Sequence, residues 1–226
     1  MKRSVISPAR IGGTLGPPGD KSISHRSTIL NAVAEGEALV TNYSPGGDCE
    51  STLRCLRSLG VPIRRLDQEG NLVIQGVGLN GFREPDNVLN AGNSGTTMRL
   101  LSGLLAGQPF LSIVTGDGSL RSRPMDRIIK PLRQMGARIQ GRDSDSKAPL
   151  VIRGGGLRGI EYTLPVASAQ LKSCLVIAAL FAEGETTLHQ PAASRDHTEL
   201  MLQQMGATLV ADGLTVKVKP GQRLRT

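Results

Sequence analysis

The segment 16-GPPGDKSISHRS-27 contains more anion-binding side chains than a hydrophobic core could use. Lys21 carries a point charge that suits phosphate, and Arg26 carries a planar fork that suits phosphate or carboxylate. The hydroxyl of Ser22 can cap a helix or donate a hydrogen bond to an anion. We interpret the cluster as part of a site for a small, highly charged anion, with solvated surface charge as the alternative.

Two other segments place comparable chemistry in front of apolar runs, 93-NSGTTMR-99 and 168-SAQLKS-173. A helix N-terminus offers free N–H groups and about half a positive charge, so it is a natural anion site. Gly95 would let an anion approach the backbone closely, and Gln170 adds amide donors. We predict that a serine caps each of the three helices and that their N-termini face one common site.

Two loops add arginines to this set. The loop 116-GDGSLRSRPM-125 contains Arg123 ahead of Pro124, and proline is favoured in the first turn of a helix. The loop 194-SRDHTE-199 contains Arg195. We expect both arginines at the anion site, although either would also be ordinary on a protein surface.

His25 and Asp48 are the two remaining candidates for acid–base chemistry. Histidine titrates near neutral pH, but a single histidine in a binding loop more commonly has a positioning or structural role. Asp48, in 46-GGDCEST-52, is expected to be the N-cap of the helix that follows it.

The elements that must position these residues form three copies of one pattern. In each copy an amphipathic helix ends in glycine and a short apolar strand follows, as in LRCLRSLGVPIRR, IKPLRQMGARIQ and ELMLQQMGATLV. The glycines are Gly60, Gly136 and Gly206, which are spaced by 76 and then 70 residues. Each glycine is expected just beyond a helix C-terminus, in the left-handed conformation.

Each copy also contains a second helix, which precedes the amphipathic helix in sequence. These helices are predicted at 22–36, 94–107 and 168–184. The third contains CLVIAALF, which is apolar on all sides and typical of a buried helix. We therefore predict an α/β fold of three repeated βαβαββ-type units packed around buried helices. The units would cover about residues 14–80, 81–157 and 158–226.

The composition narrows the class of partner. The chain has 226 residues, a net charge of +8 and an isoelectric point near 9.9, which by itself would suit nucleic acid. Aromatic residues make up only 2% and tryptophan is absent, so platforms for stacking bases are scarce. A small phosphorylated metabolite fits the charge equally well, and we expect no nucleic-acid partner.

Neither a membrane span nor a secretory leader is expected. No apolar run approaches the roughly 20 residues that a bilayer requires, and the start MKRSVISPARIGG lacks an apolar stretch. The three cysteines, Cys49, Cys55 and Cys174, are odd in number and lack metal-type spacing. We expect reduced thiols, a cytoplasmic location, and neither a metal nor a cofactor.

Together the motifs PGDKSISHR, NSGTTMR, GDGSLRSRPM, SAQLKS and SRDHTE resemble the EPSP synthase family, the 3-phosphoshikimate 1-carboxyvinyltransferases, and they occur in the family's order. SAQLKS and SRDHTE are more similar to the bacterial branch called class II. The resemblance implies one domain of an inside-out α/β barrel. It also implies a shikimate-pathway transferase that moves the enolpyruvyl group of phosphoenolpyruvate to the 5-hydroxyl of shikimate 3-phosphate and releases phosphate.

The resemblance also implies roles for individual residues. Phosphoenolpyruvate would contact Lys21, which is also the implied catalytic residue, with Gly95, Arg123 and Gln170. Shikimate 3-phosphate would contact Ser22, Arg26, Ser168, Ala169, Gln170 and Arg195. Ala169 stands where some members have a second serine, so one phosphate hydrogen bond would be missing. Gly95, rather than alanine, implies that the herbicide glyphosate fits the phosphoenolpyruvate pocket.

Family members have two such domains, and this sequence corresponds to the first. The resemblance places the catalytic aspartate and glutamate, with further basic ligands, in the second domain. We therefore expect residues 1–226 to be inactive alone and to need a complementing C-terminal domain. Residues 1–13 correspond to a strand that packs in that second domain in the family.

Two alternatives stay open at this stage. One is the related enolpyruvyl transferase that acts on UDP-N-acetylglucosamine, which usually carries a reactive cysteine in the loop matching 116–125, where this chain has none. The other is a free-standing module of the same fold that binds anions or RNA.

Overall fold

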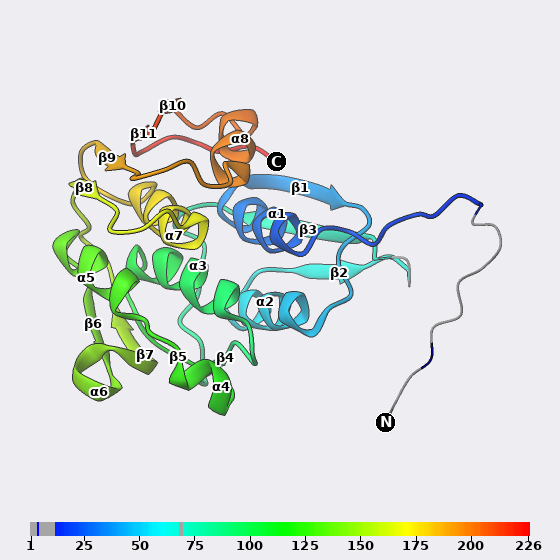
Figure 1. The fold of residues 1–226 in the computed structure, drawn as a ribbon, viewed down its shortest axis with the longest axis horizontal. Helices are drawn as coiled ribbons and strands as arrows, with labels where there is room; N and C mark the ends of the chain where they lie inside the picture. Colours follow the sequence, from blue (N-terminus) through cyan, green and yellow to red (C-terminus); the bar gives the residue numbers. More distant parts are fainter. Residues whose placement is uncertain (1–3, 5–11, 68–69) are drawn as a thin grey trace.

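The computed structural model describes residue 4 and residues 12–67 and 70–226, so the predicted strand at 1–13 lies almost wholly outside the described residues. Three small β-sheets surround a central group of helices (Figure 1). The central helices are α1 (Lys21–Val33), α3 (Gly95–Ala106) and α7 (Ala169–Ala179). The α/β class predicted from the sequence is confirmed.

The first sheet has the strand order β1-β3-β2, and both pairs of these strands are antiparallel. Its strands are β1 (Glu35–Val40), β2 (Ile63–Arg65) and β3 (Leu72–Val77). The helix α2 (Gly47–Ser58) lies between β1 and β2 in sequence and contacts α1.

The second and third sheets have equivalent strand orders, β4-β5-β7-β6 and β8-β9-β11-β10. The second contains β4 (Leu89–Asn90), β5 (Leu111–Thr115), β6 (Arg138–Gly141) and β7 (Lys147–Arg153), with α4 (Gly118–Ser122), α5 (Asp126–Gln134) and α6 (Arg142–Asp145). The third contains β8 (Glu161–Thr163), β9 (Thr186–His189), β10 (Leu209–Asp212) and β11 (Thr215–Val218), with α8 (His197–Gln204). In each, the first strand pairs in parallel with the second and the other pairs are antiparallel.

The last described residues occupy the corresponding parallel position in the first sheet. Arg225 forms a parallel bridge with Glu35, at the start of β1. The Glu35 amide donates to the Leu224 carbonyl at 2.9 Å, and the Thr226 amide donates to the Glu35 carbonyl at 3.3 Å. The third unit is thereby joined to the first, a connection that the sequence pattern did not predict.

The helices α3 and α7 pack closely against each other in the core. A Cβ added to Gly103 would lie 2.2 Å from the carbonyl oxygen of Cys174, so only glycine permits this approach. The α7 residues from Leu171 to Ala179 are all buried, as predicted for an all-round apolar helix. None of the described helices is both long enough and apolar enough to cross a bilayer.

The three predicted C-terminal glycines are confirmed. Gly60, Gly136 and Gly206 follow the ends of α2, α5 and α8 with φ values of +86°, +107° and +89°. The expectation that Pro124 starts the next helix is wrong, because α5 begins at Asp126 and Met125 is its N-cap. Arg123 instead ends the short helix α4, whose N-cap Asp117 accepts from the Leu120 amide.

Candidate functional site

The N-terminal ends of α1, α3 and α7 meet at one open cavity of about 510 Å³. Its lining contains seven of the nine residues that the motifs assign to an anionic ligand: Lys21, Ser22, Arg26, Ser168, Ala169, Gln170 and Arg195. Thr96, Ala167, Ala193 and Ser194 complete the lining. Three of these described lining residues are basic, namely Lys21, Arg26 and Arg195, and none is Asp or Glu. The cavity therefore suits an anion.

Asp20, and not Ser22, caps the first of these helices. The Asp20 side chain accepts a hydrogen bond from the Ile23 amide at 2.8 Å, so the predicted serine cap is wrong for α1. The Ser22 hydroxyl is therefore available to the cavity, where it accepts from Nη1 of Arg195 at 2.9 Å. Ser94 and Ser168 cap α3 and α7 as predicted.

Arg26 lies at the base of the cavity and is only 3% exposed. Its Nε donates to Oγ1 of Thr198 and its Nη2 donates to Oγ of Ser173, both at 2.7 Å. Its Nη1 donates to the Ser22 carbonyl at 3.0 Å. Burial lowers the pKa of the guanidinium from its usual value. Because much of its donor capacity is used within the protein, Arg26 contributes mainly positive charge to the cavity.

Gly95 and Arg123 lie beside this cavity, at the start of α3. A Cβ added to Gly95 would lie 3.1 Å from Nη1 of Arg99 and 3.3 Å from Nη1 of Arg123. The Arg123 Nη2 donates to Oδ1 of Asn93 at 2.6 Å, and Asn93 in turn donates to Asp117 at 2.7 Å. The glycine therefore leaves room for two guanidinium groups next to free backbone amides.

Arg99 is a site residue that the sequence reasoning missed. Its Nη1 donates to Oε1 of Gln170 at 2.5 Å, and the Gln170 amide nitrogen donates to Oγ1 of Thr96 at 2.9 Å. Arg99 therefore fixes the orientation of the Gln170 amide. Burial, followed by the nearby charge of Arg123, lowers the pKa of Arg99. Its position in the motif NSGTTMR, one turn after Gly95, was the available signal.

Lys21 pairs with Asp48 across the rim of the cavity. The distance from Nζ to Oδ2 is 3.1 Å, and the lysine side chain is 56% exposed. The prediction that Asp48 caps the second helix is wrong, because α2 begins at Gly47 with Gly46 as its N-cap. Asp48 lies inside the first turn, where its charge interacts favourably with the helix dipole and with Lys21.

His25 is fully buried and does not line the cavity. Its Nδ1 lies 2.7 Å from Oγ1 of Thr52, and its Nε2 has no hydrogen-bond partner among the described residues. Burial lowers its pKa to about 4. The imidazole is therefore neutral at pH 7 and has the burial of a structural residue.

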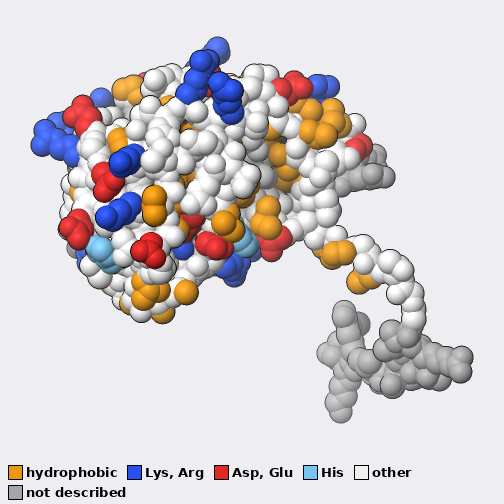
Figure 2. All heavy atoms as spheres, turned by 90° about the horizontal axis from the view of Figure 1, so that it is seen from above, with side chains coloured by type: hydrophobic (Ala, Val, Ile, Leu, Met, Phe, Trp, Pro, Cys, Tyr) orange, Lys and Arg blue, Asp and Glu red, His pale blue; other side chains and the backbone are white. Residues whose placement is uncertain are grey.

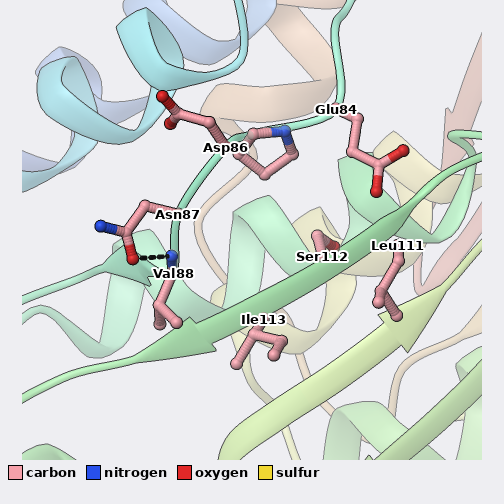
Figure 3. Close-up of a pocket in the computed structure, with 8 residues that line it drawn as sticks. Glu84, Asp86, Asn87, Val88, Leu111, Ser112 and Ile113 are labelled. Carbon is pink, nitrogen blue, oxygen red and sulfur yellow. Dashed lines mark hydrogen bonds between the residues drawn. The ribbon is translucent and has the colours of Figure 1, made fainter.

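Two other cavities lack this combination of charge and helix termini. One lies between the segment 84–88 and β5 and is lined by Glu84 and Asp86 but by no basic residue (Figure 3). The other, of about 430 Å³, is lined by Arg138, Arg153 and the glycine run 154–156, but it adjoins Pro109, beyond the C-terminal end of α3. Neither is lined by a residue that the motifs assign to an anionic ligand.

Comparison with known proteins decides the family. The sequence profile described as EPSP synthase (3-phosphoshikimate 1-carboxyvinyltransferase) matches residues 5–226. The chain belongs to the EPSP synthase family. Within the described residues of this family member, no group of three His, Cys, Asp or Glu side chains is arranged to hold a metal ion.

Relatives within the EPSP synthase family are similar over nearly all of the chain. A 3-phosphoshikimate 1-carboxyvinyltransferase of Chloroflexus aurantiacus is 55% identical over 216 residues, which are 95% of this chain and 49% of the relative. One of Geobacillus kaustophilus is 54% identical over 94% of this chain and 49% of its own length. The solved EPSP synthase of Acinetobacter baumannii superposes with a TM-score of 0.91 at 47% identity and covers 94% of this chain and 48% of that chain. The chain thus spans about half the length of the relatives that it matches.

Proposed function

We propose that this chain supplies one half of an EPSP synthase active site and binds shikimate 3-phosphate and phosphoenolpyruvate at the cavity between the helix starts. The observation that carries the proposal is the convergence of Lys21, Ser22, Arg26 and Arg195 with the capped start of α7. Two phosphorylated substrates need several cations and free backbone amides in one place, and this cavity offers both.

Shikimate 3-phosphate would take the part of the cavity between α1 and α7. In our proposal Ser22, Ser168 and Arg195 hold its phosphate, with Arg26 as a fixed positive charge below them. Ala169 lines the same wall and offers no hydroxyl, so the hydrogen bonds come from its neighbours Ser168 and Gln170. The contact between Arg195 and Ser22 already places a guanidinium and a hydroxyl 2.9 Å apart for one phosphate to bridge.

Phosphoenolpyruvate would take the part nearest the start of α3. In our proposal its phosphate lies against the Gly95 backbone and Arg123, and Gln170, oriented by Arg99, donates to it. The exposed ammonium of Lys21 faces the reacting group, where it stabilises negative charge that develops during the transfer. Glyphosate, which is a phosphonate and a carboxylate, would compete for the same groups because Gly95 adds no side chain there.

The reaction itself needs proton transfers that this cavity does not provide. The 5-hydroxyl of shikimate 3-phosphate loses its proton to a base as its oxygen adds to C2 of phosphoenolpyruvate, while C3 gains a proton from an acid. Phosphate then leaves C2 as C3 loses a proton. No carboxylate lies among the described residues that line the cavity. We therefore propose that a complementing C-terminal domain supplies the acid–base groups and closes over both substrates.

An open half site should bind its substrates weakly. Exposed charge pairs contribute only about 0–1 kcal/mol each, because water screens them. We expect a dissociation constant for shikimate 3-phosphate in the millimolar range, which corresponds to about 4 kcal/mol, and no turnover by residues 1–226 alone. Closure by a second domain would exclude water and strengthen every charged contact.

A phosphate-release assay with both substrates tests the proposal. We expect no release by the 226-residue chain alone and release when a polypeptide matching the other half of a close relative is added. The control is Arg195→Ala in the same mixture, which should remove most of the activity. Turnover by the chain alone would show that a group within 1–226 moves the protons, and no activity in any mixture would contradict the proposal.

RNA binding by the same fold has less support. In the view of Figure 2 the Lys and Arg side chains lie in separate groups interspersed with Asp and Glu, and form no continuous stripe. Tyr43 is buried and cannot serve as a stacking platform. The cysteines Cys49, Cys55 and Cys174 are free and buried, which is compatible with the reducing cytoplasmic location that we propose.

A further inference from the structure

A buried ion pair lies next to the cavity and has no part in the proposed chemistry. The Nζ atom of Lys172, one turn into α7, is 2.5 Å from Oε1 of Glu199, in the first turn of α8. Both residues are 1% exposed. Lys172 lies in the motif SAQLKS and Glu199 in the motif SRDHTE, but the motifs assign neither residue a role.

Stability alone is a poor explanation for such a pair. Removing two charges from water is costly, and an apolar pair of similar volume is often equally stable or more stable. Breaking the pair by removing one partner is a different matter, because it leaves an uncompensated buried charge. The pair is therefore expected to have a function that an apolar replacement would not perform.

The contacts of Lys172 connect the pair to the loop that carries Arg195. Its Nζ also donates to the Ser194 carbonyl at 3.3 Å. The Ser194 hydroxyl is held separately, by Oε1 of Gln190 at 2.7 Å. Arg195 is the next residue, and its guanidinium donates to the Ser22 hydroxyl. A single peptide unit thus separates the buried ammonium from the arginine proposed to hold phosphate.

A second contact fixes the same two helices beside the pair. Ser173 follows Lys172 in α7, Thr198 precedes Glu199 in α8, and their hydroxyl oxygens are 2.7 Å apart. Arg26 donates to both hydroxyls. The start of α8, where the Arg195 loop ends, is therefore tied to α7 by two adjacent polar contacts.

We propose that Lys172 and Glu199 are positioning residues, which fix residues 194–196 so that Arg195 stands over Ser22 at the phosphate position. Neither side chain contacts shikimate 3-phosphate itself. The proposal rests on the proposed function only in taking shikimate 3-phosphate as the ligand.

The test compares Lys172→Met with the double variant Lys172→Met/Glu199→Leu. The double variant removes both charges, so its melting temperature should return close to that of the wild type even if the single variant is strongly destabilised. Affinity for shikimate 3-phosphate, followed by NMR titration of the 226-residue chain, should still be weaker by up to about fivefold, because an exposed charged contact to phosphate is misplaced. The NMR backbone order parameters of Ser194 and Arg195 should be lower in the double variant without any ligand, because the Ser194 carbonyl loses its contact with Lys172.

The outcomes separate the explanations. Recovery of stability with lost affinity and lower order parameters at 194–195 supports positioning. Recovery of stability together with wild-type affinity and order parameters would show that the pair is only structural and would overturn the inference. Adding Arg195→Ala to the double variant should cause no further loss of affinity, whereas an additive loss would also contradict it. If the wild-type chain does not bind shikimate 3-phosphate, the proposed function is contradicted, while the order parameters at 194–195 still test the positioning role.

Discussion

Two polar seams leave α1 from adjacent residues and differ in charge. The neutral seam runs from His25 to Thr52 of α2, on to Thr97, and ends at Ser94, the cap of α3, with hydroxyl contacts of 2.7 Å throughout. The charged seam runs from Arg26 to Ser173 and Thr198 and continues beside the Lys172–Glu199 pair. Both seams are buried.

The difference shows how one helix serves two purposes. Burial keeps His25 neutral, so the neutral seam joins the first two units without adding charge near the start of α3. Arg26 keeps a positive charge beneath the part of the cavity that we assign to shikimate 3-phosphate. Because charge is costly to bury, Arg26 is placed where an anion can share its charge.

The largest effect should come from deleting the charge of the charged seam. Arg26→Ala removes the donor to the buried hydroxyls of Ser173 and Thr198. It also removes a cation from the neighbourhood of Glu199. We expect the free energy of unfolding to fall by about 3–5 kcal/mol, measured by urea denaturation. Arg153→Ala, at an exposed position, is the control and should change it by less than about 0.5 kcal/mol. An equally small change for Arg26→Ala would show that the seam is not important for stability.

The neutral seam should respond to acid. The pKa of His25 is about 4 in the folded chain and about 6.5 when unfolded. Between these values the unfolded chain binds more protons, so stability falls as the pH falls. This group alone should remove about 2 kcal/mol between about pH 7 and about pH 5.

The matched variant for this prediction is His25→Gln, which should lose stability less steeply over the same pH range. The control is His189→Gln, because His189 is partly exposed and pairs with Glu161 at the surface. Identical pH slopes for wild type and His25→Gln would contradict a neutral, buried imidazole.

Paired threonine substitutions compare the two seams directly. Thr198→Val removes an acceptor from a charged donor, and should lower the free energy of unfolding by about 2 kcal/mol. Thr52→Val removes the hydroxyl that contacts the neutral side chains of His25 and Thr97, and should lower the free energy of unfolding by about 1 kcal/mol. Both are measured by urea denaturation at pH 7. If Thr52→Val lowered the free energy of unfolding by more than Thr198→Val, the neutral seam would be the more important of the two for stability.

The smallest effect is expected at the rim of the cavity. Asp48→Asn breaks an exposed ion pair with Lys21 and should change the free energy of unfolding by less than about 1 kcal/mol. Raising the salt concentration should reduce even that difference, because exposed charges are screened. A larger loss of unfolding free energy that does not depend on salt would mean that the Lys21–Asp48 pair behaves as a buried ion pair and not as an exposed one.

The sequence by itself determined the features that depend on local signals. The 76- and 70-residue spacing of Gly60, Gly136 and Gly206 predicted three helix ends, and each has the expected positive φ. A helix C-terminus needs a left-handed residue whatever lies around it, so the signal is complete within a few residues. The motifs likewise singled out the residues that line the cavity, through their resemblance to a family.

Only the tertiary structure decided which groups become partners. Arg26 and Thr198 are 172 residues apart, and no local pattern pairs them. The same is true of the parallel bridge from Arg225 to Glu35 and of the buried contact between Lys172 and Glu199. The Ser22 hydroxyl likewise accepts from Arg195, which is 173 residues away. Such choices depend on packing between distant segments, where burial decides whether a charge or hydroxyl must find a partner.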